Sequence, residues 1–399
     1  MANSGMILAR ILCKAEILVR STTMGLSMSK KILITGGAGF IGSHLADHLL
    51  KKNYEVKILD NLTDQVHGPG AEWPDYLSKK IEFIKGDINN SEIVQNALSG
   101  VDAVFHFAAS VGVGQSMYRI CRYTEVNNMG TALLLENLIG KTIKKLLIAS
   151  SMSVYGEGLY RNSDGFLQNH VSRSIEQLKR CIWEPLDSNN IPLEAMPTPE
   201  TKQPNLESIY ALSKYGQERM ALMVGRAYNI PTVALRFFNV YGSRQALSNP
   251  YTGVLAIFAS RYLNGKGPVI FEDGLQKRDF VAVSDVCNAC SLALENPDIS
   301  GQVFNIGSGH PYTIREIAEK IGKVLHKEHI QPVISGKYRF GDIRHCYADI
   351  SLAQKELGYK PEITLENGLV ELSEWLKGQM AHDQIDVANA ELVERGLTV

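Results

Sequence analysis

The stretch Lys31-Ile-Leu-Ile-Thr-Gly-Gly-Ala-Gly-Phe-Ile-Gly42 decides which fold this chain can adopt. It begins with a short apolar run that is typical of a buried strand, and apolar residues at helical spacing follow Gly42. Gly37, Gly39 and Gly42 fit the pattern G-x-G-x-x-G, and with Gly36 they also fit the wider G-x-x-G-x-x-G variant. A strand, a glycine-rich turn and a helix in this order predict a turn that binds the pyrophosphate of a dinucleotide.

An acid follows the second predicted strand. Residues 55–59 form an apolar strand pattern that ends in Asp60 and Asn61. Asp60 stands about where the dinucleotide fingerprint has an acid that binds the ribose hydroxyls of the adenosine. A carboxylate there would repel a 2′-phosphate, so the sequence favours NAD over NADP. The alternative, a glycine turn in an α/β protein without a nucleotide, is disfavoured by Asp60.

Strands and helices alternate over most of the chain. Further strands are predicted over residues 81–84, 101–105, 144–149 and 232–236, with a helix over about 124–138. This alternation predicts the α/β class, as a Rossmann-type doubly wound parallel sheet with a smaller, mixed α/β C-terminal substrate-binding domain. Ligands of such sheets bind beyond the carboxyl ends of the strands. The residues expected at these ends, and therefore in one crevice, are Gly36, Asp60, Asp87, Ala108 and Ser151.

The segment Tyr210-Ala-Leu-Ser-Lys214 places a phenol and an ammonium four residues apart, on one face of a predicted helix. A neighbouring positive charge favours the phenolate form of a tyrosine. The spacing alone is common by chance. Together with the glycine turn and Ser150-Ser151 at the end of a predicted strand, it indicates nicotinamide redox chemistry.

Composition excludes several function classes. The formal net charge is −1 over 399 residues, which gives no reason to expect nucleic acid or an anionic membrane as a partner. No apolar run is long enough to span a bilayer. The six cysteines are scattered, which suits a reducing compartment and a cytoplasmic location. Cys287 and Cys290 are predicted to be buried helix residues rather than metal ligands, and no metal is expected.

Over about residues 31–376 the chain resembles the extended short-chain dehydrogenase/reductases, and within them the NAD-dependent nucleotide-sugar epimerases. The motifs that carry the resemblance are residues 35–42, Asp60-Asn61, Asp87-Ile88, residues 106–109, Asn127, Ser150-Ser151, Tyr210 with Lys214, residues 236–242, residues 278–281 and residues 339–342. Residues 153–160, 245–253 and 341–345 are most similar to dTDP-L-rhamnose 4-epimerases, and next to UDP-glucose 4-epimerases.

The resemblance implies a reaction and a set of site residues. It implies inversion at C4 of a nucleotide sugar through a transient 4-keto sugar, with Ser151, Tyr210 and Lys214 as catalytic residues. The implied NAD-binding residues are Gly36, Gly39, Phe40, Ile41, Gly42, Asp60, Asn61, Asp87, Ile88, Phe107, Ala108, Ala109, Asn127, Ser150, Tyr210, Lys214 and Phe237. The implied substrate-binding residues are Ser151, Asn239, Arg278 and Arg339. For Ser150 a backbone-capping role stays open, and for Arg344 a salt bridge with a nearby acid is expected.

Two alternatives follow from the same motifs. Related dehydratases carry an acid pair directly after the catalytic serine or threonine, where this chain has Met152 and Ser153. A 4,6-dehydratase is therefore disfavoured, whereas a reductase of the same fold stays open. An alternative from a different class is a non-catalytic NAD-binding regulator, which the presence of the Ser151, Tyr210 and Lys214 set argues against.

The expected organisation has four parts and one insertion. Residues 1–29 are a leader, expected to be disordered; residues 30–238 form the NAD-binding domain. Residues 239–380 are expected to be mainly the substrate-binding domain, from which segments can return to the main sheet, and residues 381–399 are expected to form a tail or helix. An insertion at about 159–199 is expected to form a partly ordered surface flap near the mouth of the sugar site; its single Cys181 makes a zinc site a poor prediction. The family further implies a homodimer in which helices around 124–138 and 208–228 pair.

Overall fold

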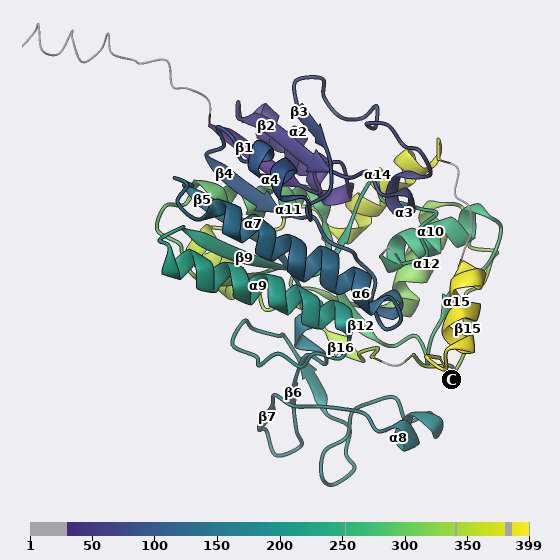
Figure 1. Cartoon of the computed structure of the whole chain (residues 1–399). Coiled ribbons are helices and arrows are strands. Elements are labelled where there is room, and N and C mark those ends of the chain that lie inside the picture. Colours follow the sequence, from purple (N-terminus) through teal and green to yellow (C-terminus); the bar gives the residue numbers. More distant parts are fainter. Residues whose placement is uncertain (1–29, 252, 340, 380–384, 399) are drawn as a thin grey trace, which may run out of the picture. The chain divides into compact units, whose positions relative to one another are not determined.

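The structure is a computed structural model that describes residues 30–399 except 252, 340, 380–384 and 399. The predicted leader, residues 1–29, lies outside the described residues. Residues 31–399 form a single unit, whose strands and helices Figure 1 shows.

Within the described residues, the central sheet has seven strands in the order β13-β9-β5-β4-β1-β2-β3, and every neighbouring pair is parallel. The order reverses at β1, which is the doubly wound arrangement that the alternation of strands and helices predicted. The strands are β1 (Lys31–Thr35), β2 (Glu55–Asp60), β3 (Glu82–Lys85), β4 (Ala103–His106), β5 (Lys145–Ser151), β9 (Thr232–Phe237) and β13 (Gln302–Ile306). β13 comes from the C-terminal part of the chain and pairs with β9.

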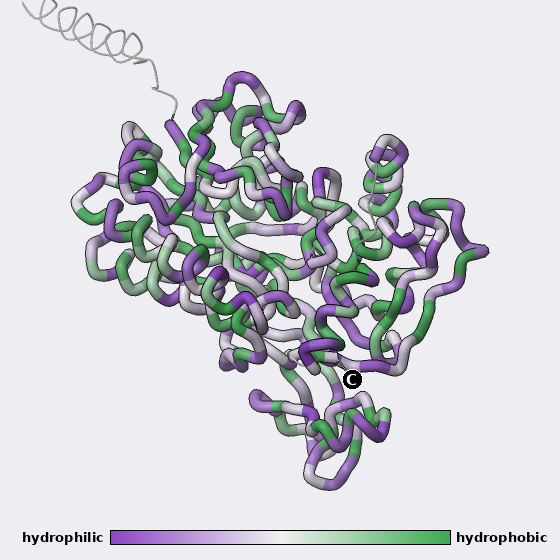
Figure 2. The backbone as a smooth tube through the Cα atoms, turned by 45° about the vertical axis from the view of Figure 1, so that its right-hand side comes forward, coloured by the Kyte–Doolittle hydropathy of each residue, from purple (hydrophilic) through white to green (hydrophobic). Residues whose placement is uncertain are grey.

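Helices cover both faces of this sheet because the strands carry apolar side chains on both sides. In Figure 1, α4 (Ser91–Ala97), α7 (Gly130–Leu138) and α9 (Ile209–Ala227) lie on one face. Their buried residues form one hydrophobic core with Leu33, Val104 and Leu146. On the other face, α2 (Phe40–Lys51), α11 (Val283–Glu295) and α13 (Ser351–Leu357) pack against Ile34 and Leu147. Figure 2 shows hydrophobic stretches running through the interior and hydrophilic segments at many outer turns.

A second group of elements forms the smaller mixed α/β part. One small sheet contains β10 (Asn239–Tyr241), β12 (Lys277–Ala282), β14 (Pro311–Thr313) and β16 (His345–Cys346), and another pairs β11 (Val269–Ile270) with β15 (Val333–Ile334). The helices α10 (Val254–Leu263), α12 (Ile314–Val324) and α14 (Leu365–Leu376) share a third hydrophobic core with β12. The tail contains α15 (Ile385–Glu394).

Short elements complete the described chain. The loops above the sheet contain α3 (Asp64–His67), α5 (Val113–Ser116), α6 (Ile120–Tyr123), the π-helix η1 (Thr124–Met129) and the 3₁₀ helix η2 (Met152–Tyr155). The insertion contains α8 (Ile175–Lys179) and an antiparallel sheet of β7 (Leu167–Gln168), β6 (Leu159–Arg161) and β8 (Glu194–Met196). In Figure 1 these insertion elements form a lobe next to β16.

The two cysteines of the Cys-x-x-Cys pattern lie where the sequence predicted them. Cys287 and Cys290 are buried in α11, as predicted, and no group of metal-ligating side chains is found among the described residues. No helix in the described part of the chain is long and apolar enough to cross a membrane.

Candidate active site

A cavity of about 430 Å³ lies at the carboxyl ends of the central strands. Its walls come from the turn after β1, the end of β2, the loop after β4, the ends of β5 and β9, and the start of α9. The predicted site residues on these walls are Gly36, Gly39, Phe40, Ile41, Gly42, Asp60, Asn61, Ile88, Phe107, Ala108, Ala109, Ser150, Ser151, Tyr210, Lys214, Phe237 and Asn239. Of the five strand-end residues expected in one crevice, Gly36, Asp60, Ala108 and Ser151 line this cavity, and Asp87 does not.

The glycine turn is shaped by close packing against the neighbouring strand. Gly36 has a φ of +69°, and a Cβ there would lie 2.8 Å from the backbone nitrogen of Ala108, so a side chain has no room. Asp60 faces the same turn. Its carboxylate accepts hydrogen bonds from the backbone N–H groups of Ala38 at 3.0 Å and Leu62 at 2.9 Å. These two bonds fix the carboxylate at the cavity wall.

Tyr210 lies in the first turn of α9, where the helix start is capped. The Ser208 hydroxyl accepts from the backbone N–H of Ala211 at 3.1 Å, as an N-cap residue does. The Ser116 hydroxyl accepts from the backbone N–H of Tyr210 at 3.0 Å, which joins α5 to the same turn. These contacts fix the position from which the Tyr210 side chain enters the cavity.

Ser151 stands opposite, where β5 ends and η2 begins. Its oxygen accepts hydrogen bonds from the backbone N–H of Ser153 at 3.2 Å and from the Ser153 hydroxyl at 2.9 Å. The Ser151 proton is thereby left for the Tyr210 oxygen. Ser151 thus acts both as the cap of η2 and as a partner of Tyr210.

The pKa of Tyr210 departs from the sequence-based prediction. Burial raises it above the ordinary value of 10, while the hydrogen bond with Ser151 acts in the lowering direction and is outweighed. The sequence predicted that Lys214 would help to lower this pKa. The protein groups alone do not produce that effect, because a phenolate in a buried position loses its hydration.

Lys214 is buried, and burial lowers the pKa of its ammonium to about 7 against an opposing attraction by Glu218. Lys214 Nζ donates to Gln217 Oε1 at 2.7 Å. A lysine is only a donor, so this bond fixes the orientation of the Gln217 amide and directs its NH₂ group toward His106 Nε2 at 3.2 Å and Thr131 Oγ1 at 2.8 Å. Lys214 is therefore the first member of a buried hydrogen-bonded chain.

His106 continues this chain to the glycine turn. Burial, with repulsion from Lys214, lowers the pKa of His106 to about 3, so its ring is neutral. Its Nε2 lies 2.8 Å from Thr131 Oγ1 and 3.2 Å from Gln217 Nε2, and its Nδ1 is hydrogen-bonded to Thr35 Oγ1 at 2.7 Å. Thr35 ends β1 directly before Gly36. The chain of bonds therefore connects α9 with the strand that leads into the glycine turn.

Four predicted site residues do not line the cavity. The Asp87 carboxylate accepts from Asn61 at 2.9 Å, and Asn127 is buried between Ser110 and Ser213. Arg278 donates to main-chain carbonyls, and Arg339 forms a salt bridge with Asp342 at 2.9 Å. The four residues outside the cavity wall are therefore Asp87, Asn127, Arg278 and Arg339. In this structure each acts on neighbouring protein groups. Ser150 lines the cavity, but its hydroxyl donates to buried Glu218 at 2.6 Å.

Sequence reasoning missed several cavity residues and their supports. Gln217 lies three residues after Lys214 on the same helix, and this spacing was a usable signal. Arg244, Gln245 and Tyr251 line the cavity from the segment after β10. That segment has no regular structure and no spacing that relates it to the glycine turn, so only the tertiary structure places it there.

The cavity fits a dinucleotide at two positions. A Cβ at Gly39 would meet only the Gly36 carbonyl oxygen within 4 Å, at 3.4 Å, and Gly39 has an ordinary φ of −71°. Protein packing therefore does not require a glycine there, whereas close approach of a pyrophosphate does. Arg244 pairs with Asp47 through Nη2 at 2.7 Å, but its buried Nη1 has no hydrogen-bond partner among the described residues. A buried donor without a partner suits an anionic ligand.

Comparison with known proteins agrees with this geometry. The family model described as "NAD dependent epimerase/dehydratase family" matches residues 32–307. A dTDP-L-rhamnose 4-epimerase of Burkholderia thailandensis is 34% identical over 355 residues, which is 88% of this chain and 96% of that protein.

Two solved structures of similar proteins cover nearly the same region. The UDP-glucose 4-epimerase of Thermotoga maritima with UDP-glucose has a TM-score of 0.71 and 31% identity, over 87% of this chain and 98% of that one. The UDP-glucose 4-epimerase of Thermus thermophilus in complex with NAD has a TM-score of 0.70 and 28% identity, over 88% of this chain and 100% of that one. With the family model matching well over half of the sequence, the chain belongs to the NAD dependent epimerase/dehydratase family.

Proposed function

We propose that this protein is a nucleotide-sugar 4-epimerase that inverts C4 through a transient 4-keto sugar, with dTDP-L-rhamnose or UDP-glucose as the type of substrate. The observation that carries the proposal is the meeting of Ser151, Tyr210 and Lys214 with the glycine turn in one cavity. Bound NAD supplies reversible hydride transfer at C4 and, when oxidised, a positively charged ring.

Tyr210 removes the proton of the 4-hydroxyl and later returns it. Ser151 has one proton left after its two bonds with Ser153, and it donates that proton to the reacting oxygen. Lys214, when protonated, favours the phenolate and holds the ribose hydroxyls of the cofactor. Because its pKa is about 7, small changes in its surroundings decide its charge near neutral pH.

Related dehydratases carry an acid directly after the catalytic serine or threonine, and this acid promotes elimination from the keto sugar. This chain has no acid at that position. Met152 is buried, and the hydroxyl of Ser153 donates to Ser151. Neither side chain can donate a proton to a leaving hydroxyl. This favours return of the hydride to the other face of the sugar, after the sugar has turned in the cavity, over a dehydratase reaction.

The diphosphate of the substrate is proposed to contact Arg278 and Arg339, with Asn239 at the nucleotide side. Phe280 lines the cavity, and Arg278 lies two residues away on the same face of β12. Arg278 is thus placed just beyond the wall that Asn239 and Phe280 form. Arginine suits this role because its guanidinium is permanently charged and binds two phosphate oxygens at once.

The direct test measures epimer formation without added NAD. The purified protein is assayed for released nicotinamide cofactor and then incubated with dTDP-L-rhamnose or UDP-glucose, with a wider panel of dTDP-, UDP- and GDP-sugars read by NMR. Tyr210→Phe is expected to lower the rate by about 10²-fold or more while the protein keeps its cofactor. Equal rates for both proteins would contradict Tyr210 as the base.

The same assay separates the alternatives. A reductase would change the redox state of the cofactor in proportion to product. A non-catalytic NAD-binding regulator would hold cofactor and yield no epimer with any sugar of the panel. The intact set of Ser151, Tyr210 and Lys214 in one cavity favours the enzyme over this second class.

A homodimer in the cytoplasm completes the proposal. Apolar side chains are exposed along the two helical segments that the family expectation pairs: Met129, Ile139, Leu212 and Met223. The five described cysteines are free thiols, which suits a reducing compartment. Recovery of the protein outside the cytoplasmic fraction of its cells would contradict that location.

A further inference from the structure

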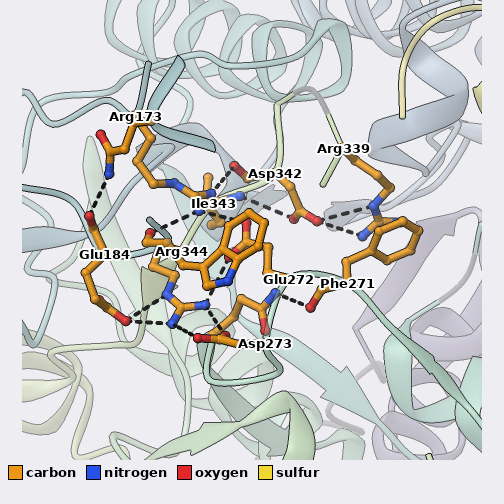
Figure 3. A network of polar contacts seen from close by, with 12 residues as sticks. Arg173, Glu184, Phe271, Glu272, Asp273, Arg339, Asp342, Ile343 and Arg344 are labelled. Atoms are coloured by element: carbon orange, nitrogen blue, oxygen red, sulfur yellow. Dashed lines mark hydrogen bonds and ion pairs between the residues drawn. The ribbon is translucent and has the colours of Figure 1, made fainter. Parts of the chain in front are cut away.

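The insertion, residues 159–199, is attached to the rest of the chain by buried charges. Its own hydrophobic core is small and contains Tyr160, Val171 and Leu193. None of its residues, all of which the structure describes, lines the cavity. The insertion therefore forms no wall of the cavity, and its expected place near the mouth of the sugar site stays a prediction. Charged contacts of the insertion go to Glu272 and to residues 342–345, and its last residues bond the main chain of Tyr347 and Asp349. Arg339 and residues 341–346 together are called the substrate-side segment (Figure 3).

Arg344 is the centre of these contacts. Its side chain is fully buried and pairs with three acids. Glu184 of the insertion lies 2.6 Å from Arg344 Nη2, and Asp273 and Glu272 lie 2.6 Å and 3.0 Å from Nη1 (Figure 3). The single salt bridge expected for Arg344 is therefore a network that joins the insertion, the β11–β12 loop and the substrate-side segment.

Arg173 makes the second attachment, from the insertion side. Its Nη1 donates to Glu272 at 2.7 Å, and its Nη2 donates to the main-chain carbonyl of Asp342 at 3.1 Å. Its Nε lies 3.3 Å from Glu157, which precedes the insertion. Figure 3 shows Arg173 and Arg344 approaching Glu272 from different sides. The insertion thus binds the backbone of the substrate-side segment directly.

Glu184 and Glu157 hold the following residues. The backbone N–H of Lys277 donates to His345 Nδ1 at 3.0 Å, so Nε2 carries the proton and donates to Glu184 at 2.8 Å. Burial raises the pKa of Glu184, but His345 and Arg344 outweigh burial and bring the pKa to about 2. Glu157 accepts from the backbone N–H groups of Arg344 at 2.8 Å and His345 at 3.2 Å.

The substrate-side segment in turn holds Arg278. The Arg278 guanidinium donates to the carbonyls of Arg344, at 2.9 Å, and of Ile343, and it lies 3.6 Å from Asp342. Asp342 also pairs with Arg339. A buried charge that loses its partner is strongly destabilising. Each member of this network is therefore held close to its partners.

We propose that the insertion is a brace that positions Arg278 and the substrate-side segment for the diphosphate of the nucleotide sugar, with Arg173 and Glu184 as positioning residues. This rests on the proposed function. It assigns the insertion a role in substrate affinity, although the insertion does not reach the cavity. The hydride and proton steps, which occur at Ser151, Tyr210 and Lys214, are left unchanged.

The test uses the full-length protein with its bound cofactor and measures the dissociation constants of UDP and dTDP by calorimetry, and KM and kcat with the accepted sugar. Arg173→Met is expected to raise the dissociation constant of the bound nucleotide about tenfold, and Glu184→Gln by a smaller factor. KM should rise in parallel, with kcat and the cofactor content unchanged. Arg173→Lys keeps the charge and should recover part of the loss.

Glu194→Gln is the matched control. Glu194 pairs with Arg161 at 2.6 Å inside the insertion, the pair is exposed, and neither residue touches the substrate-side segment. This variant should bind nucleotide like the wild type. Thermal unfolding checks that each variant is folded, and if Arg173→Met does not fold, the comparison of Glu184→Gln with Glu194→Gln decides.

Two failures are distinct. If the wild type binds UDP or dTDP and the folded Arg173 and Glu184 variants bind it within twofold of the wild type, the brace is overturned and the proposed function stands. If the wild type binds neither nucleotide and converts no sugar, the proposed function fails, and the brace fails with it. A tenfold fall in kcat with unchanged KM would also overturn the brace.

Discussion

At the scale of single residues, the environment of Lys214 decides how Tyr210 can act. Its ammonium is buried, and its bond to a described side chain goes to the neutral amide of Gln217 rather than to a carboxylate. Burial disfavours the ammonium, and the attraction by Glu218 offsets this only in part, which accounts for a pKa near 7. The amide of Gln217 is the hydrogen-bond acceptor of this ammonium, at 2.7 Å, so its replacement should change the charge beside Tyr210.

Replacing Gln217 tests this dependence. Gln217→Leu removes the acceptor of Lys214 and should lower the pKa of the lysine further, so Tyr210 loses its charged neighbour. We expect kcat to fall about tenfold and the acidic limb of its pH profile to move to higher pH. Gln217→Glu, which restores the charge of Lys214, should move that limb the other way. Equal profiles for both variants would contradict the role of Gln217.

Lys214 also predicts a pH dependence of stability. Its pKa is about 7 in the folded protein and near 10.5 in the unfolded chain. Between these values the unfolded chain binds a proton that the folded protein does not, so this group makes the free energy of unfolding rise with pH from about 7 to 10.5. Lys214→Met should therefore stabilise the protein more at pH 6 than at pH 9, measured by urea unfolding. A difference that is constant with pH would contradict the lowered pKa.

At the scale of elements, different physical causes require glycine at positions 39 and 42 of the turn after β1. A Cβ at Gly42 would lie 2.5 Å from the Gly36 carbonyl oxygen and 2.7 Å from Gly37 Cα, inside the turn itself. A Cβ at Gly39 would have ordinary contacts with the protein. Packing inside the turn explains why residue 42 is a glycine. The predicted approach of the pyrophosphate explains why residue 39 is a glycine.

Two alanine variants separate these reasons. Gly42→Ala should destabilise the protein by about 2 kcal/mol or more, because backbone atoms must move. Gly39→Ala should melt within a few degrees of the wild type but purify with much less NAD. The measurements are thermal unfolding and the amount of cofactor released on denaturation. A Gly39→Ala protein with full cofactor content would contradict the predicted approach of the pyrophosphate.

At the same scale, the ion pair of Glu184 with Arg344, which helps to attach the insertion, should make stability depend on pH. The pKa of Glu184 is about 2 in the folded protein and near its ordinary 4.5 in the unfolded chain. Its stabilising contribution is therefore complete above pH 4.5 and is lost as pH falls through about 2. The difference in unfolding free energy between wild type and Glu184→Gln should shrink over this range. A difference that grows on acidification would contradict the ionised pair with Arg344.

At the scale of the whole molecule, the exposed apolar side chains on α9 predict self-association. Leu212 and Met223 are eleven residues apart and lie on one face of the helix, with 51% and 48% of their surfaces exposed. The double variant Leu212→Glu, Met223→Glu should sediment as a monomer if this face forms the proposed dimer. Val370→Glu on α14, which is equally exposed, is the control and should leave the mass unchanged. A dimer that persists in the double variant would place the interface elsewhere.

The sequence by itself determined the local and periodic features of this protein. The glycine turn, Asp60 at the end of β2, the alternation of strands and helices, and the Tyr210 and Lys214 spacing each depend on residues close in sequence, and they predicted the doubly wound sheet and the crevice at its carboxyl edge. Short-range geometry makes such patterns readable, because backbone conformation and side-chain direction repeat with fixed periods.

Only the tertiary structure decided which distant groups share an environment. It surrounds Tyr210 with enough protein to raise its pKa, bonds Lys214 through Gln217 to His106, and attaches the insertion to Arg344. Arg278 and Arg339, which the family resemblance assigned to the substrate, are held by main chain and Asp342 beyond the cavity wall. Burial and ion pairing depend on how far-apart segments pack in space, and no periodicity in the sequence records that packing.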